Sequence, residues 1–249
     1  MPGTGLGLLR HDKPGPGSSG ALPPEAAALA RDPDRLIVTK ANSRSTVHRP
    51  SYLDYVATGV VATAVLFSSA FPGMFNTFVR WRFQRTYDAM LAAPVDVEEL
   101  VTAEVLWIAL RAGVYGLAPI LVGMIFGLPP SWGMLLIIPI GILTGFGFAA
   151  FGVLLAAIAK TIDNFNYVTS ALLTPMFLVA GTFFPVSSLP RGIREIAKFN
   201  PLYHCVQLVR DAALSHLATA DLAHAGVLLL FAVLMWRLAI WRLRGRLID

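Results

Sequence analysis

Residues 78–94 read FVRWRFQRTYDAMLAAP, a basic and aromatic segment that lies between two long apolar stretches. Residues 55–79 before it and 100–126 after it are each long and apolar enough to cross a membrane, which takes about 20 residues. A polar helix attached to membrane spans at both ends cannot leave the membrane surface. It is suited to receive force from a soluble partner and pass it into the bilayer, which favours a transport subunit over an enzyme.

The composition of the chain also indicates a membrane protein. Its 249 residues are 55% hydrophobic and 14% charged, whereas a soluble domain carries about 25% charged residues. No charged side chain occurs from 112 to 159, and the sequence GLPPSWG at 127–133 divides this run. Because two prolines stop a helix there, we expect a helical hairpin within the membrane, with its turn at one surface.

The hydropathy pattern predicts an all-α, polytopic helical bundle with five membrane spans. The predicted spans are 55–79, 100–126, 134–159, 165–185 and about 222–241. The last span contains Arg237, whose guanidinium is expected to snorkel to the interface. Prolines 72, 119, 139 and 175 lie inside spans, where they favour kinks for packing or a pathway that opens and closes. Gly141 and Gly145 form a GxxxG pattern that favours close helix packing, with a dimer face as the sharper alternative.

The distribution of basic residues predicts the orientation of these spans, because Lys and Arg accumulate on the cytoplasmic side. A cytoplasmic 80–99 connection places eight basic residues inside: Arg80, Arg82, Arg85, Lys160, Arg237, Arg242, Arg244 and Arg246. It places four outside: Arg191, Arg194, Lys198 and Arg210. This orientation puts the C-terminus in the cytoplasm.

The first 50 residues form a separate region, rich in Pro, Gly, Ala and Ser, which we expect to be a disordered polar tail that precedes a membrane domain at 51–249. With five spans, this tail would lie outside despite its basic residues, in conflict with the positive-inside rule. One additional span before residue 52 would remove the conflict.

Three groups of motifs carry a resemblance to a known family. They are RTYDAMLAAP at 85–94 followed by EVLW at 104–107, DNFNY at 163–167 with TPMFL at 174–178, and GTFFP at 181–185 with LP at 189–190. In order and spacing they resemble the membrane subunits of type-2 ATP-binding-cassette exporters, most closely the nodulation-factor (lipooligosaccharide) and drug-resistance branch. The resemblance covers about 52–249.

The resemblance implies a bacterial plasma-membrane permease that moves a hydrophobic or amphipathic substrate, such as a drug, a glycolipid or a lipooligosaccharide, out of the cell. Two such permease subunits, identical or different, would work with separate ATPase subunits, which would hold the ATP and magnesium. Family members are expected to have six spans, so the first span and its preceding amphipathic helix are expected to be missing here, where residues 1–50 stand in their place.

By the same resemblance, the segment 80–94 is the coupling helix that docks on the ATPase. Its candidate contact residues are Arg82, Arg85, Tyr87, Asp88 and Pro94, which offer charged and aromatic contacts to a soluble surface. The alternative is that the segment is an ordinary cytoplasmic loop whose basic residues follow the positive-inside rule. Lys160 and Asp163, in the short connection after the third span, are candidates for a second cytoplasmic contact or for a simple turn.

Two charged residues lie within the second span. Glu104 and Arg111 are seven residues apart, so they share a helix face at about 10 Å along the axis, too far for a close pair. A charge near the middle of a membrane normally faces protein or water, so Arg111 has either a structural partner or a role in the export pathway.

The remaining polar features are weaker signals. Residues 190–216 predict two short amphipathic helices, interfacial or re-entrant, on the outer face, divided at Asn200 and Pro201. In them His204 and His216 favour surface packing over metal binding. The chain lacks a GK pair, and therefore a Walker A loop, and it lacks HExxH and GxSxG motifs. We expect no catalytic residue, no bound metal and no nucleic-acid partner; an intramembrane enzyme and a non-transporting membrane scaffold are the alternatives.

Overall fold

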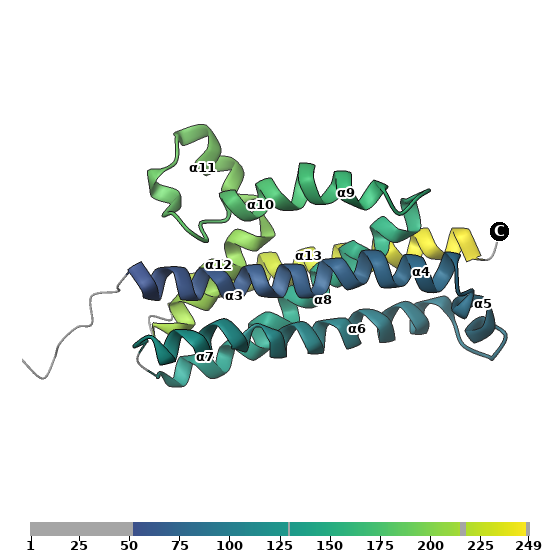
Figure 1. The fold of residues 1–249 in the computed structure, drawn as a ribbon, viewed down its shortest axis with the longest axis horizontal. Coiled ribbons are helices and arrows are strands. Elements are labelled where there is room, and N and C mark those ends of the chain that lie inside the picture. The colour runs from purple at the N-terminus through teal and green to yellow at the C-terminus, as the bar shows by residue number, and fades with distance from the viewer. Residues whose placement is uncertain (1–51, 129, 215–217, 248–249) are drawn as a thin grey trace, which may run out of the picture. The chain divides into compact units, whose positions relative to one another are not determined.

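The computed structural model describes residues 52–128, 130–214 and 218–247, and within these ranges the fold is entirely helical (Figure 1). The predicted tail at 1–50 and His216 lie outside the described residues. The predicted helical membrane bundle is confirmed. Its long helices lie roughly along one direction (Figure 1).

Four long helical segments are long and apolar enough to cross a membrane, and they match four of the five predicted spans. The first joins α3 (Tyr52–Phe71), the π-helix η1 (Pro72–Asn76) and α4 (Thr77–Arg82). The second joins α6 (Val97–Tyr115) to α7 (Leu117–Ile125). The third joins the 3₁₀-helix η2 (Trp132–Leu136) to α8 (Ile137–Ile158), and the fourth is α13 (Ala220–Leu247).

The predicted span at 165–185 is shorter than expected. Its helix consists of α9 (Asn164–Val168), the π-helix η3 (Thr169–Leu173) and α10 (Thr174–Val179). Gly181 then adopts a φ of +84°, a conformation that suits glycine and ends the helix. At 1.5 Å per residue the helix is about 24 Å long, less than the hydrocarbon core of about 30 Å.

The prolines coincide with irregular helical geometry. Pro72 begins η1, and Pro175 lies two residues after the end of η3, in the first turn of α10. Proline removes a backbone donor and clashes with the preceding turn, and a π-helical turn is one way to accommodate this. The hydroxyl of Thr174 donates to the carbonyl of Thr169 at 2.9 Å, which satisfies one acceptor in that turn. At these two positions the prolines thus lie in or beside π-helical segments.

Helix α8 lies against three other spans through a surface of small residues. An added Cβ on Gly145 would lie 3.0 Å from the Cβ of Ala112 on α6, and Gly141 packs on Gly113 of the same helix. The GxxxG pattern thus mediates close packing within one chain, as its default interpretation predicted. On another face of α8, a Cβ on Gly152 would lie only 2.6 Å from the carbonyl oxygen of Ala70.

The region between α10 and α13 contains a 3₁₀ turn, η4 (Val186–Ser188), and two helices, α11 (Arg191–Lys198) and α12 (Pro201–Ala213). They divide at Asn200, whose side-chain oxygen accepts from the N–H of Leu202 at 2.9 Å. Both predicted helices are confirmed. Helix α12 is largely buried, with core contacts to α3, α8 and α13, so it enters the bundle, in keeping with the re-entrant alternative.

The close approach at Gly152 gives a test of the packing. We expect Gly152→Ala to lower the free energy of unfolding by about 1–3 kcal/mol, because the new methyl group meets backbone that cannot move aside. The midpoint of thermal unfolding of the purified protein in detergent measures this. Gly226→Ala on α13 is the matched control, since nothing lies within 4 Å of its added Cβ. Equal midpoints for the two variants would contradict the packing described.

Candidate functional site

A short helix, α5 (Thr86–Leu91), lies at one end of the bundle between the first two spans (Figure 1). Arg85 precedes it with a φ of +49°, a left-handed conformation that is uncommon for a residue other than glycine. This turn ends the α4 helix and redirects the chain, so that α5 is a separate element. The sequence predicted the segment 80–94, and the structure divides it into the end of α4, a turn at 83–85 and the separate helix α5.

The far side of the loop is fixed by a capping box. The side chain of Asp96 accepts from the backbone at the third helical position of α6, and the side chain of Glu99 accepts from the N–H of Asp96 at 3.3 Å. Such reciprocal bonds satisfy donors at a helix start and fix where it begins. The Asp-x-x-Glu spacing was a sequence signal for this start.

The exposure of the predicted coupling residues divides them into two groups. Arg82, Arg85, Asp88 and Pro94 are exposed, so their charges and the proline ring are available to another protein. Tyr87 is only 1% exposed and packs with the core of α6, α8 and α13. The expectation that Tyr87 offers its ring to a soluble surface is therefore corrected: its position on the inner face of α5 turns it towards the spans.

A single carboxylate, that of Glu104 on α6, connects α5 to two spans. The hydroxyl of Tyr87 donates to its Oε2 atom, and the hydroxyl of Thr77 on α4 donates to its Oε1 atom at 3.0 Å. Nη1 of Arg80 lies 3.8 Å from the same Oε1 atom. The Glu104 side chain is 8% exposed, so these donors replace water around the charge. Groups from α4, α5 and α6 thus meet at one acceptor.

The same region contains a polar cavity of about 350 Å³ between the first and second spans. Glu104 and Arg111 both line it, as their shared helix face predicted, and Arg80 lies at the same cavity. The guanidinium of Arg111 lies 5.8 Å from the ring centre of Tyr115, one helical turn further along the chain. Its Nε atom is buried and has no hydrogen-bond partner among the described residues.

The predicted second contact lies in the turn between α8 and α9. Lys160 and Asp163 are both exposed there, and Thr161 donates to the side chain of Asn164 at 3.3 Å. Arg246, near the end of α13, lies 5.8 Å from the ring of Trp81 on α4. The end of the last span and the start of the coupling segment therefore lie together, in agreement with the predicted grouping of basic residues. Whether this end faces the cytoplasm remains a prediction.

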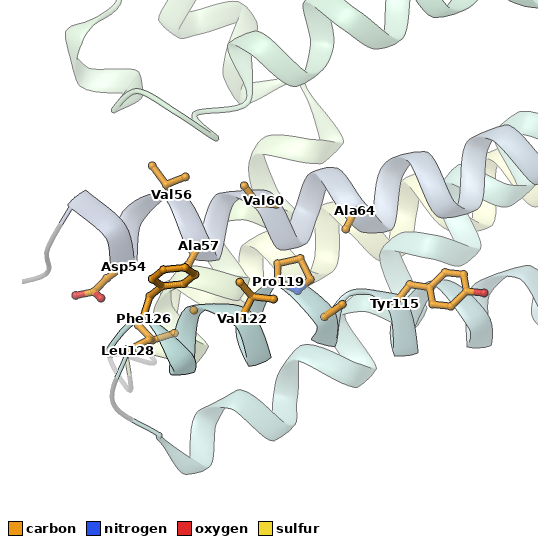
Figure 2. Close-up of a pocket in the computed structure, with 12 residues that line it drawn as sticks. Asp54, Val56, Ala57, Val60, Ala64, Tyr115, Pro119, Val122, Phe126 and Leu128 are labelled. Carbon is orange, nitrogen blue, oxygen red and sulfur yellow. The ribbon is translucent and has the colours of Figure 1, made fainter.

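A second cavity, which sequence reasoning missed, lies towards the opposite end of the bundle (Figure 2). It has a volume of about 470 Å³ between α3 and α7 and is walled by apolar side chains, among them Val60, Val122 and Phe126. Asp54 is a polar residue in its lining and is 3% exposed. Only the pairing of α3 with α7 creates this cavity, so no local sequence pattern indicated it.

His204, on α12, lies at this same end of the bundle, close to a second histidine. Its Nδ1 atom is 2.6 Å from Nδ1 of His224, and its Nε2 atom is 2.8 Å from the carbonyl oxygen of Lys198. Burial lowers the pKa of His204 from its ordinary value, against the opposing effect of the Lys198 hydrogen bond. One of the two Nδ1 atoms donates to the other, which is consistent with a packing role for His204.

The Glu104 contacts can be tested by a double-mutant cycle. We expect Tyr87→Phe to lower the free energy of unfolding by about 1–3 kcal/mol, because it leaves a buried carboxylate oxygen without its donor. In a Glu104→Gln background the same change should cost less, giving a coupling energy of at least about 0.5 kcal/mol from thermal unfolding of the purified protein. Tyr167→Phe, at a tyrosine that is 74% exposed on α9, is the control. Additive effects of the two changes would show that the contact is not energetically significant.

Comparison with known proteins gives an independent result. The family model described as ABC-2 type transporter matches residues 35–214. Nodulation protein J of Sinorhizobium fredii is 32% identical over 80% of this chain and 76% of its own length. Nodulation protein J of Neorhizobium galegae is 33% identical, covering 79% of this chain and 75% of its own length.

A more distant relative is named as a transport protein. The inner membrane transport permease YadH of Escherichia coli is 25% identical over 80% of this chain and 78% of its own length. No solved structure matches the chain. The match to the family model over most of the chain, the identity to bacterial relatives and the helical membrane bundle agree, and the chain belongs to the ABC-2 type transporter family as a multi-pass membrane permease.

Proposed function

We propose that this chain is the membrane subunit of an ATP-driven exporter that moves a hydrophobic or amphipathic substrate out of a bacterial cell. In this proposal two such subunits assemble with a separate ATPase, which binds ATP and magnesium. Membership of the ABC-2 type family supports the general class, because its members are transport permeases. The coupling mechanism and the substrate are proposed from the chemistry of the described residues.

The observation that carries the proposal is the position of α5. Its outer side presents Arg85 and Asp88 to the surroundings, while its inner side donates from Tyr87 to Glu104 on α6. Thr77 of α4 donates to the same carboxylate. A displacement of α5 by a docked partner therefore acts on the ends of two spans at once, through hydrogen bonds to a buried charge.

The exposed charges also indicate the kind of partner surface that would bind. Arg82 and Arg85 are cations and Asp88 is an anion, all on one short segment. Exposed charges of this kind contribute mainly to specificity and to the rate of association, since they steer a complementary surface into register. Pro94, at the far end of the segment, adds a rigid apolar contact.

The first test removes the proposed docking contact. We expect Arg85→Glu to weaken binding of the partner ATPase at least about tenfold, because the reversed charge meets a like charge on the partner. Affinity of the detergent-purified permease for the ATPase that co-purifies with the unchanged protein measures this. Arg191→Glu, an equal charge change at an exposed position on α11, is the control. ATPase binding that Arg85→Glu leaves unchanged would refute docking through this segment.

A second test separates docking from coupling. We expect Glu104→Gln to leave ATPase binding within about twofold, since Glu104 does not face the docking side, and to reduce the stimulation of ATP hydrolysis by substrate about tenfold or more. Both quantities are measured on the same reconstituted complex, normalised to the amount of folded permease. If stimulation survives in this variant, the Glu104 contacts do not transmit the movement of α5. A protein that binds the ATPase without stimulation in its unchanged form would be a scaffold and not an exporter.

A further inference from the structure

The polar cavity between the first two spans has an unusual position for its chemistry. It reaches from Gln84, in the turn after α4, to Arg111 on α6. Arg111 is fourteen residues from the start of α6 at Val97, which corresponds to about 21 Å along the helix axis. Both α4 and α6 belong to segments long and apolar enough to span a membrane. The cavity therefore carries polar groups from the membrane surface to a depth where lipid chains cannot solvate them.

The charges that line this cavity do not balance. Glu104 is the carboxylate in its lining, and it already accepts from Tyr87 and Thr77 and lies near Arg80. Arg111 lies about 10 Å further along the helix, beyond reach of a close pair with Glu104. Its described contact is with the face of Tyr115, at the outer limit of a cation–π distance. With its Nε atom unpartnered among the described residues, Arg111 is a cation with donors to spare.

An arginine with free donors beside a cavity favours one class of ligand. The planar guanidinium matches the geometry of a phosphate or carboxylate through two parallel hydrogen bonds, and burial strengthens the pairing. Amide groups of Asn76 and Gln84 line the same cavity and add neutral donors. Trp107 also lines it and is 67% exposed, so its ring can contact an apolar chain outside the cavity. The combination fits an amphiphile with an anionic head group.

We infer that this cavity binds the phosphate ester of a membrane-borne amphiphile, with Arg111 as the principal donor, Arg80 and the two amides nearer the surface, and Trp107 beside the apolar chain. The link between this binding and export rests on the proposed function above, for which it specifies the substrate class. The binding itself does not depend on ATP hydrolysis. Water alone in the cavity is the competing outcome.

Trp107 provides the measurement. The protein is reconstituted in nanodiscs that contain equal mole fractions of brominated phosphatidylglycerol or brominated phosphatidylcholine, whose bromine atoms quench nearby tryptophan fluorescence. The difference in emission between the unchanged protein and Trp107→Phe isolates the signal of this residue. We expect about fivefold preference for the anionic lipid over the zwitterionic one, because the cation in the cavity favours the head group that carries no compensating positive charge.

Variants assign this preference to Arg111. Arg111→Gln should remove it, whereas Arg111→Lys should retain part of it because the charge remains. Arg237→Gln on α13 is the matched control, since Arg237 is also a cation within a predicted span and does not line the cavity. Equal quenching by the two lipids in the unchanged protein, or a preference that survives Arg111→Gln, would overturn the inference.

A competition experiment identifies the source of the phosphate. Inorganic phosphate at millimolar concentration, with sulfate at equal ionic strength as a control for screening, should leave the lipid preference unchanged. Loss of the preference with phosphate alone would show that the site takes a soluble ion, and would overturn the membrane-borne assignment. Absence of lipid preference with intact ATPase coupling would refute only this inference. Lipid preference in a protein that fails to bind an ATPase would refute only the proposed function.

Discussion

The arrangement of this protein depends on one buried charge. Glu104 lies within a span, where an unpaired carboxylate is costly, and it is stabilised there because Thr77 and Tyr87 donate hydrogen bonds to it and Arg80 lies within ion-pair distance. The buried carboxylate requires its hydrogen bonds, and these bonds also constrain the geometry. Helices α4, α5 and α6 have to keep their positions for the bonds to remain intact. A surface helix that was held only by its loops would be free to move without effect on the spans. Here its movement removes a donor from a charge that water cannot easily reach.

The close packing of α8 supplies the rigid frame against which such a movement can act. At the glycine positions of α8, the backbones of α6 and η1 come into direct contact with α8. The ends of these helices therefore cannot adjust independently. Small residues in membrane helices give dispersion contacts that lipid does not replace. The π segment at Pro72 lies within this packed contact with α8.

The parts of this structure that follow local patterns were predictable, and those that depend on pairing were not. Four spans and the division at Asn200 could be predicted because hydropathy and proline chemistry act within one segment. The burial of Tyr87 could not, since it depends on Glu104, which comes from another helix. The early end of α10 depends on Gly181. Glycine has a nearly neutral hydropathy, so it does not mark a boundary within an apolar stretch. Similarly, the amphipathic pattern of α12 is compatible with a position at the membrane surface, yet its apolar side is enclosed by three other helices.

The two cavities lie at different levels of the interface between the first two spans and differ in polarity. The polar cavity is lined by Arg111, and the apolar cavity by Tyr115, and these two side chains contact each other. Beyond Tyr115 the chain passes from α6 to α7, and the lining becomes almost wholly apolar (Figure 2). A cation over an aromatic face is a contact that an anionic ligand competes for, because the guanidinium then gains charge-assisted hydrogen bonds in exchange. The Arg111–Tyr115 contact thus lies where a ligand bound on the polar side would alter the boundary of the apolar side.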